Sequence, residues 1–415
     1  MAKKKFVNAN IYGHPEAHEI LVENGKFKQF GNNLPKADEE IDLKGNLVVP
    51  PYVDAHLHLD YVFTGMNDGA VNDTGTLFEG IARWHDVKKG QTIEDVKERA
   101  LRGIREEVSR GVQYIRTHVD VTDPKLTSLK ALLELREELK DKVTIQLISF
   151  PQEGMYAYEG GAELVEEGLK MGADVVGGIP HFEWAREIGE KSVHKTIELA
   201  VKYDKMVDVH CDETDDVQAR FLELLNALAM IEGIGPRTAA SHTCSFGSAD
   251  NAYAFRMMGL FQKSKINFIC PPTENAYLQG RQDTYPKRRG ITRVKEFMEM
   301  GINVCFAQDS INDPWYPLGN GNMMNILDNG IHMAQVMSFA EIERDFDLIT
   351  YNGAKTLCVE DEYGLENGKP ANFIVLEAPT VFEAIRNRAD VLCSIRNGEY
   401  LFARKPKAYD VPLTL

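Results

Sequence analysis

The chain has 415 residues, 43% of them hydrophobic and 27% charged, which is ordinary for a globular protein with one large domain and a smaller one. Its 63 acidic residues outnumber its 47 basic ones, and the net charge of −16 argues against binding nucleic acid, because phosphate contacts need lysine and arginine in excess. The six cysteines form no C-x-x-C pair and no run of about 18 apolar residues occurs, so we expect a cytoplasmic protein without a membrane partner.

Both ends of the chain are typical of short strands joined by tight turns. Asn24-Gly25 and the segment 396–399 have the composition of hairpin turns. The predicted strands lie at 6–11, 19–22, 40–43, 371–376 and 390–395. We therefore predict that residues 1–48 and 360–415 together form one small β-sandwich domain.

The middle of the chain, residues 49–359, alternates strands with helices eight times. The predicted strands lie at 48–56, 111–119, 143–150, 173–180, 206–211, 237–242, 265–270 and 302–308. The helical stretches lie at 91–109, 126–140, 160–171, 189–204, 215–232, 249–262, 291–300 and 322–344. This arrangement predicts an α/β fold, a (β/α)8 TIM barrel, rather than an open doubly wound sheet.

Two histidines end the first barrel strand. Alternate side chains of a strand share a face, so His56 and His58 point the same way. Such barrels carry their chemistry at the carboxyl-terminal ends of the strands, and two later strands end near His210 and Asp309. Three imidazoles and one carboxylate suit a single divalent metal ion, Fe2+ or Zn2+, with room left for water.

Each of these residues also has a purely structural interpretation. His210 alone could be a buried, hydrogen-bonded histidine, and Asp309 alone could cap a loop or a helix. Their position at the ends of different strands of one barrel favours the metal site. Glu213 and His242 are left over beside it, and hydrolysis needs two such proton-handling groups.

Two further histidines follow strands at the same rim. His118 ends the second predicted strand and His181 follows the fourth. Because four ligands are already assigned, we predict that both support the ligands or the fold.

The motifs at the strand ends resemble those of the amidohydrolase superfamily and, more narrowly, those of the bacterial cytosine deaminases. The segments that carry the resemblance are 54–58, 150–154, 208–213, 240–243, 278–281, 283–290 and 313–319. They lie along essentially the whole chain. The resemblance implies one metal ion bound by His56, His58, His210 and Asp309, without a carboxylated lysine, because no lysine ends the fourth strand.

The resemblance also implies roles for other side chains. Glu213 is expected to shuttle protons to the pyrimidine ring and the leaving amine, and His242 to hold the hydrolytic water. Gln152 is expected to grip the base through its amide. The remaining expected pocket residues are Leu77, Phe150 and Trp315.

The requirements of the reaction agree with these roles. Removing an amine from an aromatic amidine carbon needs a hydroxide, which a metal supplies by lowering the pKa of bound water to about 7. The ring nitrogen and the leaving ammonia must be protonated, which Glu213 can do while Asp309 accepts the proton of the water. The amide of Gln152 offers the donor and acceptor that a base edge requires. Because the H-x-E…P-C-x-x-C signature of the nucleic-acid deaminases is absent, we expect a free pyrimidine base as the substrate.

One position departs from the cytosine deaminases. Their ligand aspartate is followed by a second aspartate, whereas Ser310 follows Asp309 here. The smaller, neutral side chain opens the wall near ring position 5, so we expect 5-substituted cytosines as substrates, with 5-methylcytosine giving thymine as the natural candidate. The alternative is that Ser310 changes little and that cytosine remains the main substrate.

Two other functions stay open at this point. The same site could serve an amidohydrolase of another cyclic amidine, such as isocytosine, isoguanine, creatinine or a substituted triazine. A metal-storing or regulatory barrel would need neither Glu213 nor His242. Because barrels of this kind commonly associate, we also expect a homo-oligomer.

Overall fold

The computed structural model describes residues 3–406 and divides into two compact units. The larger unit contains residues 52–107 and 112–360, and the smaller contains the described residues up to 51, 108–111 and those from 361 onward. Domain boundaries after residues 48 and 359 remain a prediction.

The larger unit contains an eight-stranded sheet in which every pair of neighbours is parallel. Its strands, in chain order, are β7 (Tyr52–Leu57), β8 (Val112–Asp120), β9 (Thr144–Phe150), β10 (Val175–Gly178), β11 (Met206–Cys211), β12 (Thr238–His242), β13 (Asn267–Cys270) and β14 (Val304–Phe306). The first and last strands meet just beyond β14, where the backbone N–H of Asp309 donates to the carbonyl of His56 at 2.8 Å. The nearly closed ring confirms the predicted barrel.

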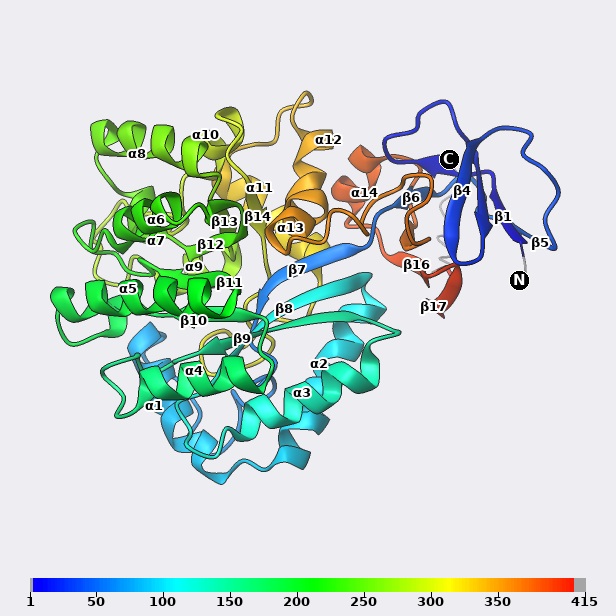
Figure 1. Ribbon diagram of the computed structural model, residues 1–415. Coiled ribbons are helices and arrows are strands. Elements are labelled where there is room, and N and C mark those ends of the chain that lie inside the picture. Colours follow the sequence, from blue (N-terminus) through cyan, green and yellow to red (C-terminus); the bar gives the residue numbers. More distant parts are fainter. Residues whose placement is uncertain (1–2, 407–415) are drawn as a thin grey trace, which may run out of the picture. The chain divides into compact units, whose positions relative to one another are not determined.

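Helices follow each barrel strand (Figure 1). The longer ones are α1 (Leu77–Val87), α2 (Ile93–Ser109), α3 (Thr127–Leu139), α4 (Gly161–Met171), α5 (Arg186–Tyr203), α6 (Phe221–Ile231), α8 (Asn251–Ser264) and α11 (Met323–Ala334). The shorter ones are η1 (Lys88–Gly90), η2 (Pro180–Phe182), η3 (Gly235–Arg237), α7 (Cys244–Gly247), α9 (Pro272–Leu278), α10 (Val294–Glu299), α12 (Ile342–Asp345), η4 (Phe346–Ile349) and α13 (Tyr351–Thr356). Helix α2 illustrates how a helix packs through one apolar face. Its residues Val96, Ala100 and Ile104 recur at helical spacing and are buried.

The smaller unit is built from both ends of the chain, dark blue and red in Figure 1. One sheet has the order β4-β3-β1-β5 and the other β17-β16-β15-β6-β2. Their bounds are β1 (Lys3–Val7), β2 (Asn10–Ile11), β3 (Glu19–Glu23), β4 (Lys26–Gly31), β5 (Glu39–Asp42), β6 (Leu47–Val49), β15 (Phe373–Leu376), β16 (Val391–Arg396) and β17 (Glu399–Ala403). Helix α14 (Val381–Asn387) lies between β15 and β16 in the chain. Phe6 and Phe373 meet in the shared core with ring centroids 4.9 Å apart, which confirms the predicted small sheet domain.

Several sequence-based boundaries were wrong. The predicted strand 6–11 is two strands, β1 and β2. The predicted strand 48–56 is two strands, β6 and β7, because Pro50 and Pro51 lack the N–H that a strand ladder needs. The predicted helix 215–232 begins only at Phe221, where the Asp212 carboxylate accepts hydrogen bonds from the first backbone N–H groups of α6. The predicted helix 322–344 is interrupted between α11 and α12.

Within residues 3–406, no helix combines the length and the apolar character that crossing a membrane requires.

Candidate active site and metal centre

A small cavity with about 240 Å³ of empty volume opens at the carboxyl-terminal ends of the barrel strands. All of the site residues predicted from the sequence line it, except His56 and Phe150. Tyr61 and Glu274 line it as well, and neither was predicted. The structure therefore gathers side chains from widely separated parts of the chain into one place.

The four predicted metal ligands lie close together and are buried. Nε2 of His58 lies 3.1 Å from Nε2 of His210. Oδ1 of Asp309 lies 3.4 Å from Nε2 of His56 and 3.5 Å from Nε2 of His58. Ligands bound about 2.0–2.2 Å from one cation are themselves roughly 3 Å apart, so these spacings fit a single coordination sphere.

The protonation states also suit a cation. Burial lowers the pKa of His58 and of His210 well below the usual histidine value, so both rings are neutral and each offers a lone pair. Two neutral nitrogens facing each other at 3.1 Å repel unless a proton or a metal ion lies between them. Nε2 of His56 has no hydrogen-bond partner among the described residues. The site thus has the donors of a metal site.

His56 is held by a relay on the opposite side of its ring. Its Nδ1 lies 2.9 Å from the Ser241 hydroxyl, which donates to Oδ1 of Asp208 at 2.6 Å. Asp208 in turn accepts from Nη1 of Arg116 at 3.3 Å. A hydrogen on Nδ1 leaves the Nε2 lone pair free for a metal, which is the usual tautomer of a ligand held by a carboxylate relay.

His118 lies beside this relay. Its Nε2 is 3.1 Å from Nδ1 of His56 and 3.8 Å from Oδ1 of Asp208. His118 also groups with His56 and His210 as possible metal donors within 4.8 Å of one another. Its contact with the far nitrogen of His56 supports the predicted role of a side chain that positions a ligand.

Two of the site residues have unusual backbone conformations. His242 has a φ of 66° and Asp309 has a φ of 68°, in the left-handed region that residues with a Cβ rarely adopt. Such conformations cost about 1–3 kcal/mol and persist where the surrounding structure enforces them. Here the backbone N–H of Asp309 is tied to the carbonyl of His56, which fixes where its carboxylate points.

Glu213 and His242 lie next to the ligands. Nδ1 of His242 is 3.6 Å from Oε1 of Glu213 and 3.7 Å from Oδ2 of Asp309. Burial, with a further contribution from the charge of Asp309, raises the pKa of Glu213 well above its usual range. This direction favours the protonated carboxyl group, the form that can donate a proton to a bound molecule.

Gln152 presents its side chain to the cavity from the end of β9. It is buried, and its Oε1 has no hydrogen-bond partner in the described part of the chain. Its backbone N–H donates to Oδ1 of Asp120 at 3.3 Å. The other oxygen of Asp120 accepts from the indole of Trp84 and from the buried ammonium of Lys88, both at 2.8 Å. Asp120 thus anchors the loop that carries Gln152, although the sequence did not single it out.

Leu77 and Trp315 close one side of the cavity. The indole Nε1 of Trp315 donates to the carbonyl of Leu77 at 3.2 Å, and its ring packs against Tyr61 with centroids 4.6 Å apart. A Cβ at Gly80 would lie 2.4 Å from the same indole nitrogen. Only glycine at that position lets α1 approach the tryptophan this closely.

Phe150 does not line the cavity. Its buried ring stacks on the imidazole of His210, with centroids 4.3 Å apart and planes inclined by 21°. This contact fixes the orientation of a ligand, and a direct contact of Phe150 with the base stays a prediction.

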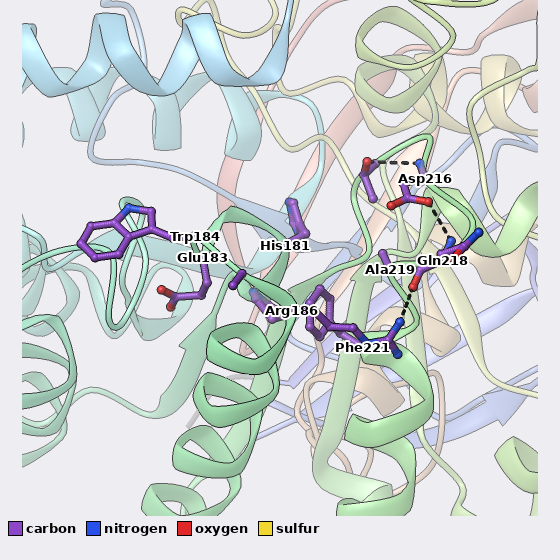
Figure 2. Close-up of a pocket in the computed structure, with 11 residues that line it drawn as sticks. His181, Glu183, Trp184, Arg186, Asp216, Gln218, Ala219 and Phe221 are labelled. Atoms are coloured by element: carbon purple, nitrogen blue, oxygen red, sulfur yellow. Dashed lines mark hydrogen bonds between the residues drawn. The ribbon is translucent and has the colours of Figure 1, made fainter.

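His181 lines a second, wider cavity with about 830 Å³ of empty volume, whose wall includes Trp184 and Phe221 (Figure 2). Nε2 of His181 lies 4.0 Å from Oε2 of Glu213, and burial lowers the pKa of His181 to about 4. It therefore stands as a neutral ring beside the proton-handling carboxyl group. Its predicted supporting role stays a prediction.

Helix α9 brings two residues that the sequence analysis missed. The amide Nδ2 of Asn275 lies 2.9 Å from Nδ1 of His242. Glu274 is buried and lines the cavity, and burial, together with Asp309 and Asp313, raises its pKa well above the usual range. The sequence analysis could have found Glu274 and Asn275 by looking for polar residues after the seventh barrel strand, β13, as it did after the other strands.

The sequence profile of the amidohydrolase family matches residues 39–402. A solved 5-methylcytosine deaminase from Klebsiella pneumoniae, bound to 5-fluorocytosine, is 47% identical, with a TM-score of 0.95 over 98% of this chain and 99% of that one. An N-isopropylammelide isopropyl amidohydrolase from Pseudomonas sp. (strain ADP) is 30% identical over 367 residues, 88% of each chain. A pterin deaminase from Rhizobium rhizogenes is 25% identical over 389 residues, 92% of this chain and 87% of that one.

Proposed function

The chain belongs to the amidohydrolase family, and from this premise we propose that it is a metal-dependent deaminase of free cytosines, with 5-methylcytosine as its preferred substrate. The observation that carries the proposal is the cluster of three imidazoles and one carboxylate, spaced 3.1–3.5 Å apart, in a cavity that Glu213 and Gln152 also line. The similarity to a 5-methylcytosine deaminase at 47% identity supports the substrate class.

His56, His58, His210 and Asp309 would hold one divalent ion, and their mixture of imidazole and carboxylate suits Fe2+ or Zn2+. When bound, such an ion would lower the pKa of a water molecule and so provide a nucleophile near neutral pH.

The side chains around the ion supply the proton transfers. Glu213 gives its proton to a ring nitrogen, which makes the neighbouring amine-bearing carbon electrophilic, and later passes a proton to the departing ammonia. Oδ2 of Asp309 has no hydrogen-bond partner among residues 3–406 and would take the proton of the attacking water. His242, beside both carboxyl groups, holds that water in place.

Gln152 would orient the base. A primary amide pairs its acceptor and donor with the carbonyl and ring N–H of a pyrimidine edge. The unpartnered Oε1 of Gln152 supports this role, because a buried amide oxygen without a hydrogen bond is costly unless a ligand satisfies it.

Ser310 would set the choice between cytosine and 5-methylcytosine. It lines the cavity directly after the ligand Asp309, where a carboxylate would occupy the space that a 5-methyl group needs. A steric clash excludes a methyl group far more strongly than a fitting pocket favours it. Cytosine as the main substrate is the alternative in which Ser310 changes little.

The relatives named for N-isopropylammelide and pterin favour a second candidate function, the hydrolysis of another cyclic amidine such as isoguanine, creatinine or a substituted triazine. A barrel that only stores or senses metal would not need a protonated Glu213 beside the ligands.

We further propose a homo-oligomer in the cytoplasm. Five of the six free cysteines are buried, Cys358 being the exception, as expected of thiols kept in a reducing compartment.

The test is ammonia release from cytosine, 5-methylcytosine and isoguanine by protein loaded with Fe2+ or with Zn2+. The expected result is turnover of both cytosines, with the higher kcat/KM for 5-methylcytosine. Turnover of isoguanine or a triazine alone would replace this proposal with the second candidate.

A further inference from the structure

Glu274 lies in the cavity wall without a role in the proposed chemistry. It sits in α9, is only 2% exposed and lines the same cavity as Gln152 and Glu213. Ser310 lines the same cavity, and Oε2 of Glu274 has no hydrogen-bond partner in the described structure. A buried carboxyl oxygen without a partner is costly, and a ligand can satisfy it.

The order of strands places Glu274 opposite Gln152. Gln152 follows β9 and Glu274 follows β13, which are four strands apart in a ring of eight. Glu213 follows β11, midway between them on one side of the ring. Each βα loop thus contributes one wall of the mouth.

The atoms of a pyrimidine ring match this order. Carbon 2 and carbon 5 are opposite each other, with nitrogen 3 and the amine-bearing carbon 4 between them. With Gln152 reading the carbonyl at position 2 and Glu213 serving nitrogen 3, position 5 points to the wall of Glu274 and Ser310. This placement rests on the proposed function.

That wall is rigid. A Cβ on Gly319 would lie 1.7 Å from the carbonyl oxygen of Ser310, so the two segments are in close contact. The carboxyl group of Asp313 accepts hydrogen bonds from the backbone N–H groups of Trp315 and Tyr316 at 3.0 and 3.1 Å. The backbone segment that carries Ser310 is therefore held in place in the wall of the cavity.

We propose that Glu274 is a specificity-determining residue that receives a hydroxyl group on the 5-substituent, so that the enzyme also deaminates 5-hydroxymethylcytosine. A methyl group leaves Oε2 of Glu274 without a partner. A hydroxyl group both donates and accepts, so it satisfies a carboxyl group in either protonation state.

The reaction is the same hydrolysis. Water adds its oxygen to carbon 4, the bond from carbon 4 to the exocyclic nitrogen breaks, and that nitrogen leaves as ammonia with one proton of the water. The other proton of the water ends on nitrogen 3 of the product. The products are 5-hydroxymethyluracil and ammonia, and no oxidant or reductant is needed.

The first experiment compares two substrates of similar size, 5-hydroxymethylcytosine and 5-ethylcytosine, by ammonia release from the metal-loaded full chain. They differ by a hydroxyl in place of a methyl group. We expect kcat/KM to be on the order of 10- to 100-fold higher for the hydroxymethyl base, the range that one hydrogen bond to a carboxyl group supplies.

The second experiment measures the same ratio in variants. Glu274→Leu should bring the ratio close to one, and Glu274→Gln should keep most of it, because an amide still bonds a hydroxyl group. Thr273→Val is the control: it changes the preceding residue of α9, which does not line the cavity, and should keep the wild-type ratio. The ratio is insensitive to a general loss of folded protein.

Two results would overturn the proposal. One is a wild-type ratio near one while cytosine is turned over, and the other is a wild-type ratio that survives in Glu274→Leu. Failure of the proposed function looks different, because then neither cytosine nor 5-methylcytosine releases ammonia and the ratio has no value.

Discussion

The core of the small unit and the mouth of the barrel are both buried, yet they are built from opposite kinds of side chain. In the small unit, Phe6, Phe373 and Ile395 are fully buried apolar residues packed on one another. At the mouth, Glu213 and Asp309 are almost as deeply buried and keep oxygens without partners in the described structure. Burying an apolar side chain stabilises the fold by about 1.5–3 kcal/mol, whereas an unsatisfied polar group costs about 1–3 kcal/mol. Burial thus stabilises the fold in the small unit's core, whereas at the mouth it is maintained at a cost in stability.

Removing the metal should have the largest effect on the chemistry at the mouth of the barrel. After chelation we expect turnover to fall by at least about 10³-fold, because nothing else in the cavity lowers the pKa of water to near neutrality. The melting temperature should fall too, since the cation stabilises only the folded ligand set. Ammonia release, elemental analysis and thermal melts check this, with Fe2+ or Zn2+ restoring all three. A metal-free protein working at full speed would refute the metal site.

Glu213→Gln removes the proton donor and leaves the ligands intact. We expect kcat to fall by about 10²- to 10⁴-fold, the usual contribution of a general acid or base. The metal content should stay at the wild-type level, which separates this variant from His210→Ala, in which binding itself should weaken. A kcat within threefold of the wild type would exclude Glu213 as the proton shuttle.

Asp120→Asn loosens the anchor of Gln152 without touching the cavity. We expect KM to rise about tenfold with a smaller change in kcat, because the lost hydrogen bonds to a charged group hold the base-reading loop. Steady-state kinetics with 5-methylcytosine measure the split. Asp141→Asn, at an exposed turn, is the matched control and should leave both constants unchanged. An Asp120→Asn enzyme with unaltered KM would show that the anchor is not needed.

Ser310→Asp narrows the wall near ring position 5. We expect kcat/KM for 5-methylcytosine relative to cytosine to fall about tenfold or more, because the larger carboxylate meets the methyl group. Parallel assays of both bases give the ratio. If the aspartate variant handles 5-methylcytosine as well as the wild type does, the account of Ser310 is wrong.

Ile20→Val tests the apolar core of the small unit and should have the smallest effect on turnover. Ile20 is fully buried in the small unit, so losing one methyl group should lower the free energy of unfolding by about 0.5–1.5 kcal/mol. Urea denaturation measures this loss. The kcat/KM per folded molecule should match the wild type, and a large drop would show that the sandwich takes part in catalysis.

Local patterns were enough to find most of the strands and the strand-end histidines. Alternation along a strand predicts that His56 and His58 share a face, and the carboxyl-end rule predicts that His210 and Asp309 converge with them. Both inferences need only short segments, and the observed spacing of the four side chains agrees with them.

The residues that the sequence analysis missed were missed for two different reasons. Glu274 lies four residues beyond the end of β13, on a short helix that was not predicted. Asp120 matters because Trp84, Lys88 and Gln152 meet it in space, and no pattern near Asp120 shows this. The prediction of one strand at 48–56 was wrong for a local reason, because two prolines interrupt it.

The ring order of the barrel has an evolutionary consequence. Because Gln152, Glu213 and Glu274 come after β9, β11 and β13, each edge of a bound heterocycle would be read by a separate loop. Mutations that redesign one edge can then accumulate while the loops that perform hydrolysis are inherited unchanged. Relatives named for N-isopropylammelide, pterin and 5-methylcytosine are consistent with such a history.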